Sequence, residues 1–167
     1  MYTVGQIVVY GSHGVCRVSD IETRVINKKK VEYYVLIPID QNDSQFLLPT
    51  GNSTVMAKMS PLLSKEEIDC LLRRGLNDDA WIEDENLRKQ KYRELITGSD
   101  RASLISMVRA LHIHKEKQLE AARKFHLCDE NFLKDAQRLL CAEFSVSLGI
   151  SRQEVGQYII DHLNNCY

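Results

Sequence analysis

Apolar and polar residues follow two different patterns, which meet near residue 60. In the first part, short β-prone runs are separated by glycine or polar turn residues, and Pro49 closes the last run because proline cannot donate to a strand ladder. Residues 27–30, Asn-Lys-Lys-Lys, are turn-prone and predict a hairpin tip. The runs cover residues 4–10, 15–21, 23–26, 31–37 and 46–49. Such brief strands predict a small, strongly bent antiparallel β-barrel.

Helical spacing replaces the strand pattern after residue 60. Ser64 and Glu67 have the spacing of a capping box, so a short helix is expected to begin there and to end at Gly75. A second helix is expected to end at Gly98, where glycine suits a left-handed cap. The inward positions expected for this second helix are Leu87, Lys91, Leu95 and Ile96, with Tyr92 beside them.

Two longer helices are predicted next. Ser99 or Asp100 can cap the first of them, whose apolar stripe runs over residues 104–122 with a step close to 3.5 residues. The other is expected to begin near Asp129 and to stop at Gly149. Its predicted inward residues are Phe132, Leu133, Ala136, Leu139, Leu140 and Phe144.

A second capping box, formed by Ser151 and Glu154, opens a terminal helix. The chain shows no internal repeat, which favours a compact bundle over a solenoid. We therefore expect an α+β protein with two domains. Residues 1–60 would form the bent antiparallel barrel, and residues 61–167 would form a compact bundle of about five helices.

Composition limits the class of protein. The chain has 167 residues, 44% of them hydrophobic and 27% charged, which excludes disordered and collagen-like chains and allows one large domain or two small ones. The sequence contains no membrane-length apolar run and no signal-peptide pattern at its start, so we expect a cytoplasmic protein without a membrane partner. Five widely spaced cysteines without a C-x-x-C pair favour reduced thiols in the cytosol.

The formal net charge of −1 conceals an uneven distribution. Residues 77–85 hold five acidic side chains and no basic one, whereas residues 88–124 hold ten Lys and Arg against four acidic residues. The plain interpretation of the second segment is a solvated helix face. The alternative is a surface that binds a polyanion, because local charge can attract a ligand that the net charge would not.

Signs of enzyme chemistry are few. The sequence has no phosphate-binding loop, dinucleotide fingerprint, zinc-protease motif or nucleophile elbow. His112 and His114 are two residues apart, so on a helix they point to different faces and cannot readily share one metal ion. His13 fits a tight turn, and Cys128, before a predicted helix, has no recognisable catalytic partner. We expect no enzymatic activity, no cofactor, no metal and no small-molecule substrate.

Trp81 allows two interpretations. It is the single tryptophan and lies next to acidic residues, outside any clear apolar periodicity. One interpretation is an anchor that folds back on the helical bundle. The other is an exposed aromatic wedge beside the basic residues that follow, because proteins that bind the minor groove insert apolar side chains between bases while basic groups hold the phosphates. The residues alone do not decide between the two.

Several segments resemble a known family. Four segments are similar to a domain that two groups of proteins share. They are V-G-Q-I-V-V-Y-G-S-H-G-V at residues 4–15, I-E-T-R at 21–24, E-Y-Y-V-L at 32–36 and the strand that ends at 48–49. The shared domain is the RNA-polymerase-interacting domain of CarD/CdnL regulators and transcription-repair coupling factors. No helicase motor follows, which weakens the coupling-factor alternative. Later segments resemble the helical domain of stand-alone CarD-like proteins. They are Trp81, Arg88, the break at residues 97–100, the apolar stripe at residues 104–111 and residues 129–143.

The resemblance implies where RNA polymerase would be bound. It implies a Tudor-like bent barrel that docks on the polymerase β subunit at its lobe and protrusion, partly by strand pairing at a sheet edge. The docking arginine of the family follows the I-E-T tripeptide, so it corresponds to Arg24, with Ile26 on the same strand face. Leu47 occupies a position where members often carry a second basic residue, which implies a more apolar polymerase contact.

The resemblance also implies a DNA contact. Trp81 corresponds to the family tryptophan that wedges into the minor groove at the upstream edge of the transcription bubble. Basic residues after it would grip phosphates, although the acidic residues of segment 82–86 would oppose DNA if exposed. These basic residues are Arg88, Lys89, Lys91 and Arg93.

The function implied is that of a non-enzymatic bacterial transcription regulator. It would bind RNA polymerase and promoter DNA, largely without sequence preference, and stabilise the open complex; we expect a monomer. One alternative is a protein–protein interaction module that docks on RNA polymerase without DNA contact. Another is a small enzyme that uses Cys128 or the histidines.

Overall fold

A computed structural model describes residues 1–40, 44–74 and 81–164. The chain divides into two compact units, Met1–Leu62 and Leu63–Tyr167, compared with the expected ranges 1–60 and 61–167. The first unit is an antiparallel sheet and the second is helical, so the predicted α+β class is confirmed. The predicted helix end Gly75 lies outside the described residues, as do two of the five acidic residues of segment 77–85, Asp78 and Asp79, and one of the five cysteines, Cys166.

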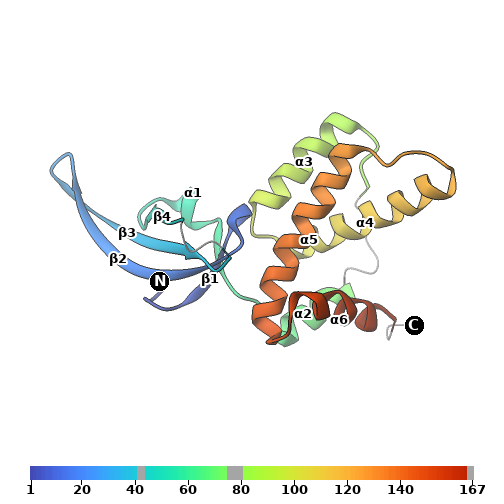
Figure 1. Ribbon diagram of the computed structural model, residues 1–167. Coiled ribbons are helices and arrows are strands. Elements are labelled where there is room, and N and C mark those ends of the chain that lie inside the picture. The colour runs from blue at the N-terminus through green and yellow to red at the C-terminus, as the bar shows by residue number, and fades with distance from the viewer. Residues whose placement is uncertain (41–43, 75–80, 165–167) are drawn as a thin grey trace. The chain divides into compact units, whose positions relative to one another are not determined.

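The first unit is built on five antiparallel strands. They are β1 (Ile7–Tyr10), β2 (Val15–Ile26), β3 (Lys29–Pro38), β4 (Phe46–Pro49) and β5 (Met59–Pro61), in the spatial order β4-β3-β2-β1-β5 (Figure 1). The predicted runs 15–21 and 23–26 form one continuous strand, β2, whose register with β3 shifts between Val18 and Asp20. A shift of this kind increases local twist and bends the strand. Strand β5 was not predicted.

Two short helical segments complete the first unit. The 3-10 helix η1 (Gly11–His13) connects β1 to β2 and ends at Gly14, whose φ of 75° suits glycine. His13 therefore lies in a tight turn, as the sequence predicted. The centroid of its ring is 4.2 Å from the centroid of the Phe46 ring. Helix α1 (Ser53–Met56) precedes β5 and is capped by the side chain of Asn52.

The β2–β3 hairpin is longer than the rest of the sheet. Asn27 and Lys28 form its tip with φ values of 51° and 64°, the combination that a two-residue type I′ turn requires. The predicted hairpin tip is thus confirmed and narrowed to these two residues. Strands β2 and β3 stay paired out to Ile26 and Lys29, whereas β4 accompanies β3 only between Tyr33 and Leu36 (Figure 1).

One side of the sheet forms the core of the first unit. The buried side chains on it are Val8, Cys16, Val18, Tyr34, Leu36, Leu48 and Met59. Burial, with a smaller contribution from the charge of Asp40, raises the pKa of the Cys16 thiol to about 11. This thiol stays protonated at neutral pH, and Cys16 acts as a small core residue.

The described residues of the second unit form five helices, as expected. They are α2 (Lys65–Arg74), α3 (Glu85–Thr97), α4 (Arg101–Glu120), α5 (Leu127–Leu148) and α6 (Arg152–Asn164). Both predicted capping boxes are confirmed. The backbone N–H of Ser64 donates to the Glu67 carboxylate at 2.7 Å, and that of Ser151 donates to the Glu154 carboxylate at 2.8 Å.

Two helix boundaries differ from the prediction. Gly98 has φ −83° and ψ −171°, an extended rather than a left-handed cap, because the chain passes straight from α3 to Asp100, which caps α4. Helix α5 begins at Leu127 rather than near Asp129, and the side chain of His126 caps it. Its end agrees with the prediction, since Gly149 adopts a left-handed conformation with φ 66°.

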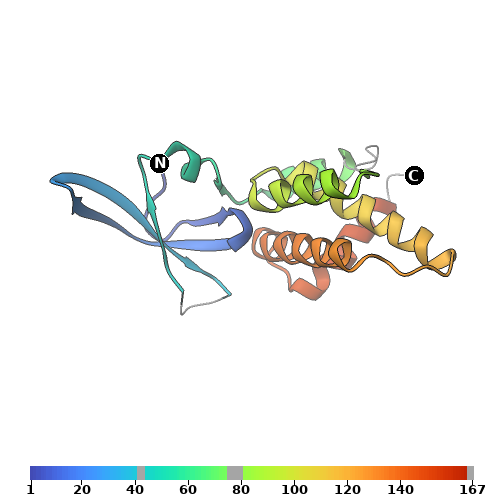
Figure 2. The same ribbon diagram turned by 90° about the horizontal axis from the view of Figure 1, so that it is seen from above.

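Helices α4 and α5 supply most of the second core. All six predicted inward residues of α5 are buried, and they pack with Leu104, Met107 and Leu111 of α4. Helix α3 lies beside α5 (Figure 2). Ile96 is buried as expected, whereas Leu87, also expected inward, is 55% exposed. The buried residues of α3 are Arg88, Tyr92 and Ile96. Successive residues of these three are four positions apart, so all three lie on one side of the helix.

A buried ion pair joins α4 to α5. Arg101 Nε donates to Glu143 Oε2 at 2.9 Å, and the other carboxylate oxygen accepts from the backbone N–H of Leu63 at 3.2 Å. The two side chains are 8% and 3% exposed. Because the Glu143 carboxylate has partners on both oxygens, its burial is compensated.

We expect Glu143→Ala to lower the free energy of unfolding of the second unit by about 3–5 kcal/mol, since it leaves the Arg101 charge buried without its carboxylate. Urea denaturation followed by far-UV circular dichroism measures the change. Glu130→Ala is the control, because Glu130 pairs with lysines at the surface, where an ion pair contributes about 1 kcal/mol or less. Equal losses in the two variants would contradict the assignment.

Candidate protein-docking face and nucleic-acid interface

The register of the sheet brings the three predicted polymerase contacts to one face. Arg24 pairs with Val31 on β3, and Leu47 pairs with Val35 on the same strand. Side chains of directly paired residues share a face, and residues two apart along a strand do so too. Arg24, Ile26 and Leu47 therefore lie on the side of the sheet opposite the core that contains Tyr34 and Leu36, and we call this side the outer face.

Arg24 is accessible on the outer face. Its side chain is 47% exposed, and its guanidinium contacts the neighbouring Glu22 carboxylate at 2.7 Å. A surface ion pair of this kind contributes little stability, so a carboxylate on a partner can replace Glu22 at low cost. Ile26, two residues further on, is 46% exposed, and Leu47 is half-buried.

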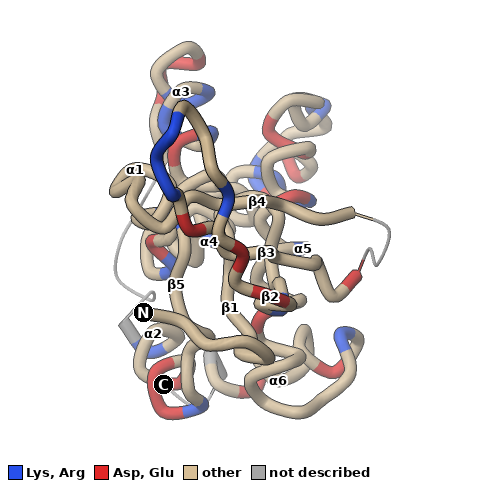
Figure 3. The backbone as a smooth tube through the Cα atoms, turned by 90° about the vertical axis from the view of Figure 1, so that its left-hand side faces the viewer, with Lys and Arg blue, Asp and Glu red and all other residues tan. Residues whose placement is uncertain are grey.

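The hairpin tip adds positive charge around Arg24. Lys28, Lys29 and Lys30 follow one another at the turn, and all three are exposed. Figure 3 shows these basic positions along the β2–β3 hairpin, which faces the viewer. Val25, which pairs with Lys30 and lies on the face opposite Arg24, is 68% exposed. The tip therefore combines cations with apolar side chains, a composition suited to a protein surface that carries acidic groups.

Strand β4 forms one edge of the sheet. In the part of the chain that the structure describes, its ladder partner is β3 alone. The other edge of such a strand carries backbone groups to which an additional strand can bind. Leu47 lies on β4, so a strand added at this edge would lie next to its side chain.

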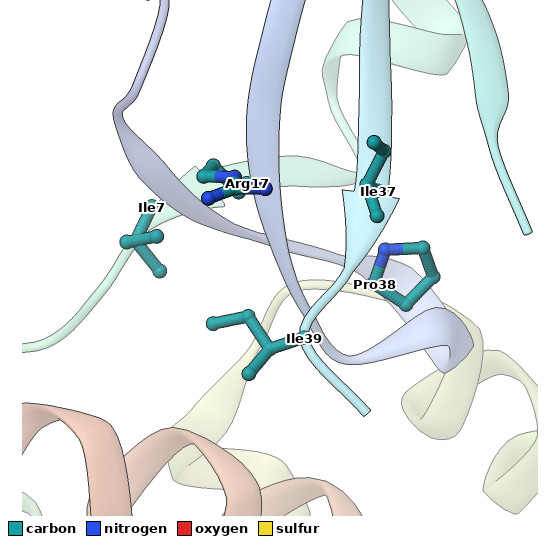
Figure 4. A pocket seen from close by; sticks show the side chains of 5 residues that line it. All are labelled: Ile7, Arg17, Ile37, Pro38 and Ile39. Carbon is teal, nitrogen blue, oxygen red and sulfur yellow. The ribbon is translucent and has the colours of Figure 1, made fainter. Parts of the chain in front are cut away.

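A small pocket lies on the sheet away from the hairpin tip. It has a volume of about 340 Å³ and is lined by Ile7, Arg17, Ile37, Pro38 and Ile39. Arg17 lies between Ile7 and Ile37, with which it is paired across the strands (Figure 4). One arginine among apolar side chains provides no nucleophile and no proton acceptor for catalysis. The pocket therefore does not support the enzyme alternative.

In the helical unit, Trp81 rests against two side chains. Its ring stacks on the His114 imidazole, with centroids 3.5 Å apart and planes at 13°, and Cζ of Arg88 lies 4.3 Å from the indole centroid. The indole is half-buried and packs against the helical core. This packing agrees with the first interpretation, an anchor on the bundle, and part of the side chain remains accessible. The exposed wedge stays a prediction.

Arg88 differs from its predicted role as a phosphate contact. It is 6% exposed, and its Nε and Nη2 donate to the two carboxylate oxygens of Asp129, both at 3.0 Å. Nη1 donates to the backbone carbonyl of Ile82 at 2.7 Å. Burial opposes the charge, but the bonds to Asp129 raise the pKa of the guanidinium above its ordinary value. Arg88 is engaged inside the protein and is not a surface cation.

The other predicted basic residues of α3 remain at the surface. Lys89 pairs with Glu85 one turn earlier, Lys91 lies 3.7 Å from the Glu94 carboxylate, and Arg93 is exposed. Lys89 and Arg93 are four residues apart and lie on one side of the helix, whereas Lys91 lies on another. The three cations therefore do not form one cluster.

His114 is the neighbour of Trp81 that sequence reasoning missed. The sequence did not connect His114 with Trp81. The prediction that His112 and His114 point to different faces is confirmed: the His112 ring contacts the Gln137 amide at 2.7 Å, while His114 stacks on Trp81. Burial and the charge of Arg88 lower the pKa of His114. A neutral imidazole, which makes a good stacking partner for indole, is therefore favoured at physiological pH.

The surroundings of the candidate metal and thiol residues can be described for part of the chain. Among the residues described, no group of three or more His, Cys, Asp or Glu side chains is placed to hold a metal ion. Cys128 lies in the first turn of α5 and packs against the helical core. None of the helices in the described part of the chain is long and apolar enough to cross a membrane.

The structure consists of a sheet unit, whose outer face carries the accessible Arg24, and a helical unit, which carries a half-buried tryptophan. A family model described as the CarD-like/TRCF RID domain matches residues 2–61, nearly the whole sheet unit. The N-terminal unit is thus similar to this domain family, and the predicted resemblance to CarD-like proteins is confirmed.

A curated relative matches almost the entire chain. It is the Bacillus subtilis (strain 168) protein named "Putative transcription factor YdeB", with 24% identity over 166 residues, which cover 95% of this chain and 99% of that protein. Together with the domain match, it supports a role in transcription with RNA polymerase as the partner. This family is one of transcription factors and polymerase-interacting domains rather than a known class of enzymes.

Proposed function

We propose that this protein is a bacterial transcription regulator that bridges RNA polymerase and promoter DNA. The sheet unit binds the β subunit, and the helical unit binds DNA near the upstream edge of the bubble and stabilises the open complex. The observation that carries the proposal is the match of the sheet unit to a polymerase-interacting domain, in which Arg24, Ile26 and Leu47 share one outer face. The protein acts as a cytoplasmic monomer without enzymatic activity.

Docking uses the outer face and the β4 edge. The accessible Arg24 guanidinium pairs with a carboxylate of the lobe and protrusion region of the β subunit. Ile26 and Leu47 add apolar contacts, and a β-subunit strand aligned on β4 adds backbone hydrogen bonds. The lysines at the hairpin tip favour an acidic partner surface and speed the encounter.

Trp81 supplies the DNA contact. His114 and Arg88 contact the half-buried indole and support it from the protein side. The accessible part of the indole stacks on a DNA base step that the bubble has already opened. Lys89, Lys91 and Arg93 approach the phosphates, each by exchanging an intramolecular or solvent partner for the DNA. Arg88 supports the wedge from inside and does not contact phosphate.

Simultaneous binding to polymerase explains how weak DNA contacts can stabilise the open complex. Docking on polymerase fixes the helical unit near one promoter position and so raises its effective concentration there. The contacts read backbone and stacking rather than base edges, so binding is largely independent of sequence. Because unstacking is partly complete in the open complex, the wedge binds that state more tightly than the closed one and shifts the population toward it.

A lifetime measurement tests the proposal. We expect saturating protein to prolong the half-life of heparin-resistant complexes between bacterial RNA polymerase and a short-lived promoter about tenfold, which is about 1.4 kcal/mol of differential binding. The protein alone should bind the same DNA weakly and lose that affinity as salt rises. Polymerase binding with an unchanged half-life would favour the alternative, an interaction module without DNA contact.

A further inference from the structure

We infer that Asp129 is a positioning residue for Trp81, and that it acts through the guanidinium of Arg88. The consequence of this arrangement for DNA binding rests on the proposed function, whereas the arrangement itself can be tested in the free protein. Asp129 lies 48 positions after Trp81 in the sequence and on a different element, in the first turn of α5.

Arg88 connects the tryptophan segment to α5. Its Nε and Nη2 bind the Asp129 carboxylate in a fork, while its Nη1 donates to the carbonyl oxygens of Ile82 and Glu83 at 2.7 and 3.3 Å. Ile82 and Glu83 directly follow Trp81, so the guanidinium fixes the backbone next to the indole. Its Cζ also lies 4.3 Å from the indole centroid and supports the ring.

Asp129 determines where that guanidinium lies. It is 2% exposed and accepts two parallel hydrogen bonds, a geometry that fixes both the position and the plane of an arginine head group. Its own position is fixed because α5 is the central helix of the core, with Phe132 and Leu133 buried one turn later. The α5 core thus fixes Asp129, Asp129 fixes the guanidinium of Arg88, and Arg88 supports Trp81.

A contribution to stability alone does not explain well why Arg88 and Asp129 form a buried ion pair. A buried ion pair can often be replaced by apolar residues of similar volume with little loss of stability, because desolvation offsets most of the attraction. Arg101 and Glu143 form a second buried pair in the same bundle, in which Glu143 accepts from the backbone N–H of Leu63 and Arg101 donates to the backbone carbonyl of Ser99. This second pair offers a matched control.

The single tryptophan makes the inference directly measurable. Acrylamide quenching of Trp81 fluorescence reports how firmly the indole is held, with no other tryptophan contributing. The test variant is the double substitution Arg88→Met with Asp129→Leu, which keeps the volume apolar and leaves no buried charge unpaired. Asp129→Asn is the second variant, and Glu143→Gln is the control. All are measured at a temperature where circular dichroism shows native helix content.

We expect the double variant to remain folded while its quenching constant rises about twofold and its emission shifts to the red, because the segment after Trp81 opens locally. Asp129→Asn should change in the same direction, and Glu143→Gln should match the wild type. If the folded double variant keeps the wild-type quenching constant and emission, Asp129 does not position Trp81.

The open-complex assay separates this inference from the proposed function. If both hold, the double variant loses most of the lifetime gain although it binds polymerase normally, since an indole misplaced by about 1 Å loses much of its stacking. If quenching rises but neither this variant nor Trp81→Ala changes the lifetime, the positioning role stands and the DNA wedge is refuted. If the lifetime falls equally in Glu143→Gln, the loss is general and the positioning role is refuted.

Discussion

Replacing Trp81 with alanine is expected to remove the gain in open-complex lifetime while leaving polymerase binding intact. Stacking of an aromatic side chain on a base is worth about 1–3 kcal/mol, which is comparable with the about 1.4 kcal/mol of differential binding expected for the wild-type protein, so the lifetime should fall about 5- to 10-fold. The limit is the lifetime of polymerase alone. Dissociation of heparin-challenged complexes measures this effect, at protein concentrations that saturate polymerase for both variants.

The control for this experiment is Trp81→Phe, which keeps an aromatic ring of smaller area. It should retain part of the gain, because a phenyl ring still stacks on a base and on His114. Circular dichroism should show native helix content in both variants, since the indole is only half-buried. A full lifetime gain from folded Trp81→Ala would refute the wedge.

Arg24→Glu is expected to weaken binding to an isolated β-lobe fragment about 100-fold or more. The substitution removes a charge-assisted contact worth 2 kcal/mol or more at a hot spot, about 30-fold, and places a like charge against the partner carboxylate. Thermal stability should hardly change, because the Arg24 side chain is 47% exposed and its pair with Glu22 is a surface pair. Titration calorimetry measures the affinity.

Lys30→Glu is the matched control. It makes the same charge reversal on the same hairpin, but Lys30 pairs with Val25, so its side chain lies on the face opposite Arg24. We expect a loss of affinity of about tenfold or less, from weaker long-range attraction alone. Equal losses in both variants would mean that the β subunit responds to overall charge and not to the outer face.

The sheet unit was predictable to a large extent because its signals are local. The turn at Asn27 and Lys28 follows from residue types that tolerate positive φ, and alternation in the flanking strands places Arg24 and Ile26 on one face. That Leu47 shares this face required the register of β3 with β4. Strand β5 escaped prediction because its three residues include Pro61 and carry no alternation.

The surroundings of Trp81 were predictable only in part. Periodicity treats arginine as a solvent-facing residue, so Leu87 was placed inward on α3 and Arg88 outward. The reverse arrangement depends on Asp129, a charge partner 41 residues away whose position only tertiary packing reveals. The stack of Trp81 on His114 likewise joins distant segments. Ionisable residues that are buried in pairs carry no periodic signal in a single sequence.

The central claim is that one chain must hold polymerase and DNA at the same time. A cycle of open-complex lifetimes tests it most directly, with wild type, Arg24→Glu, Trp81→Ala and the double variant at one moderate protein concentration. If the protein is a bridge, each single variant loses the lifetime gain and the double variant loses no more, because either break disconnects the same bridge. Losses that add independently, or a gain that survives in Arg24→Glu, would contradict the bridge.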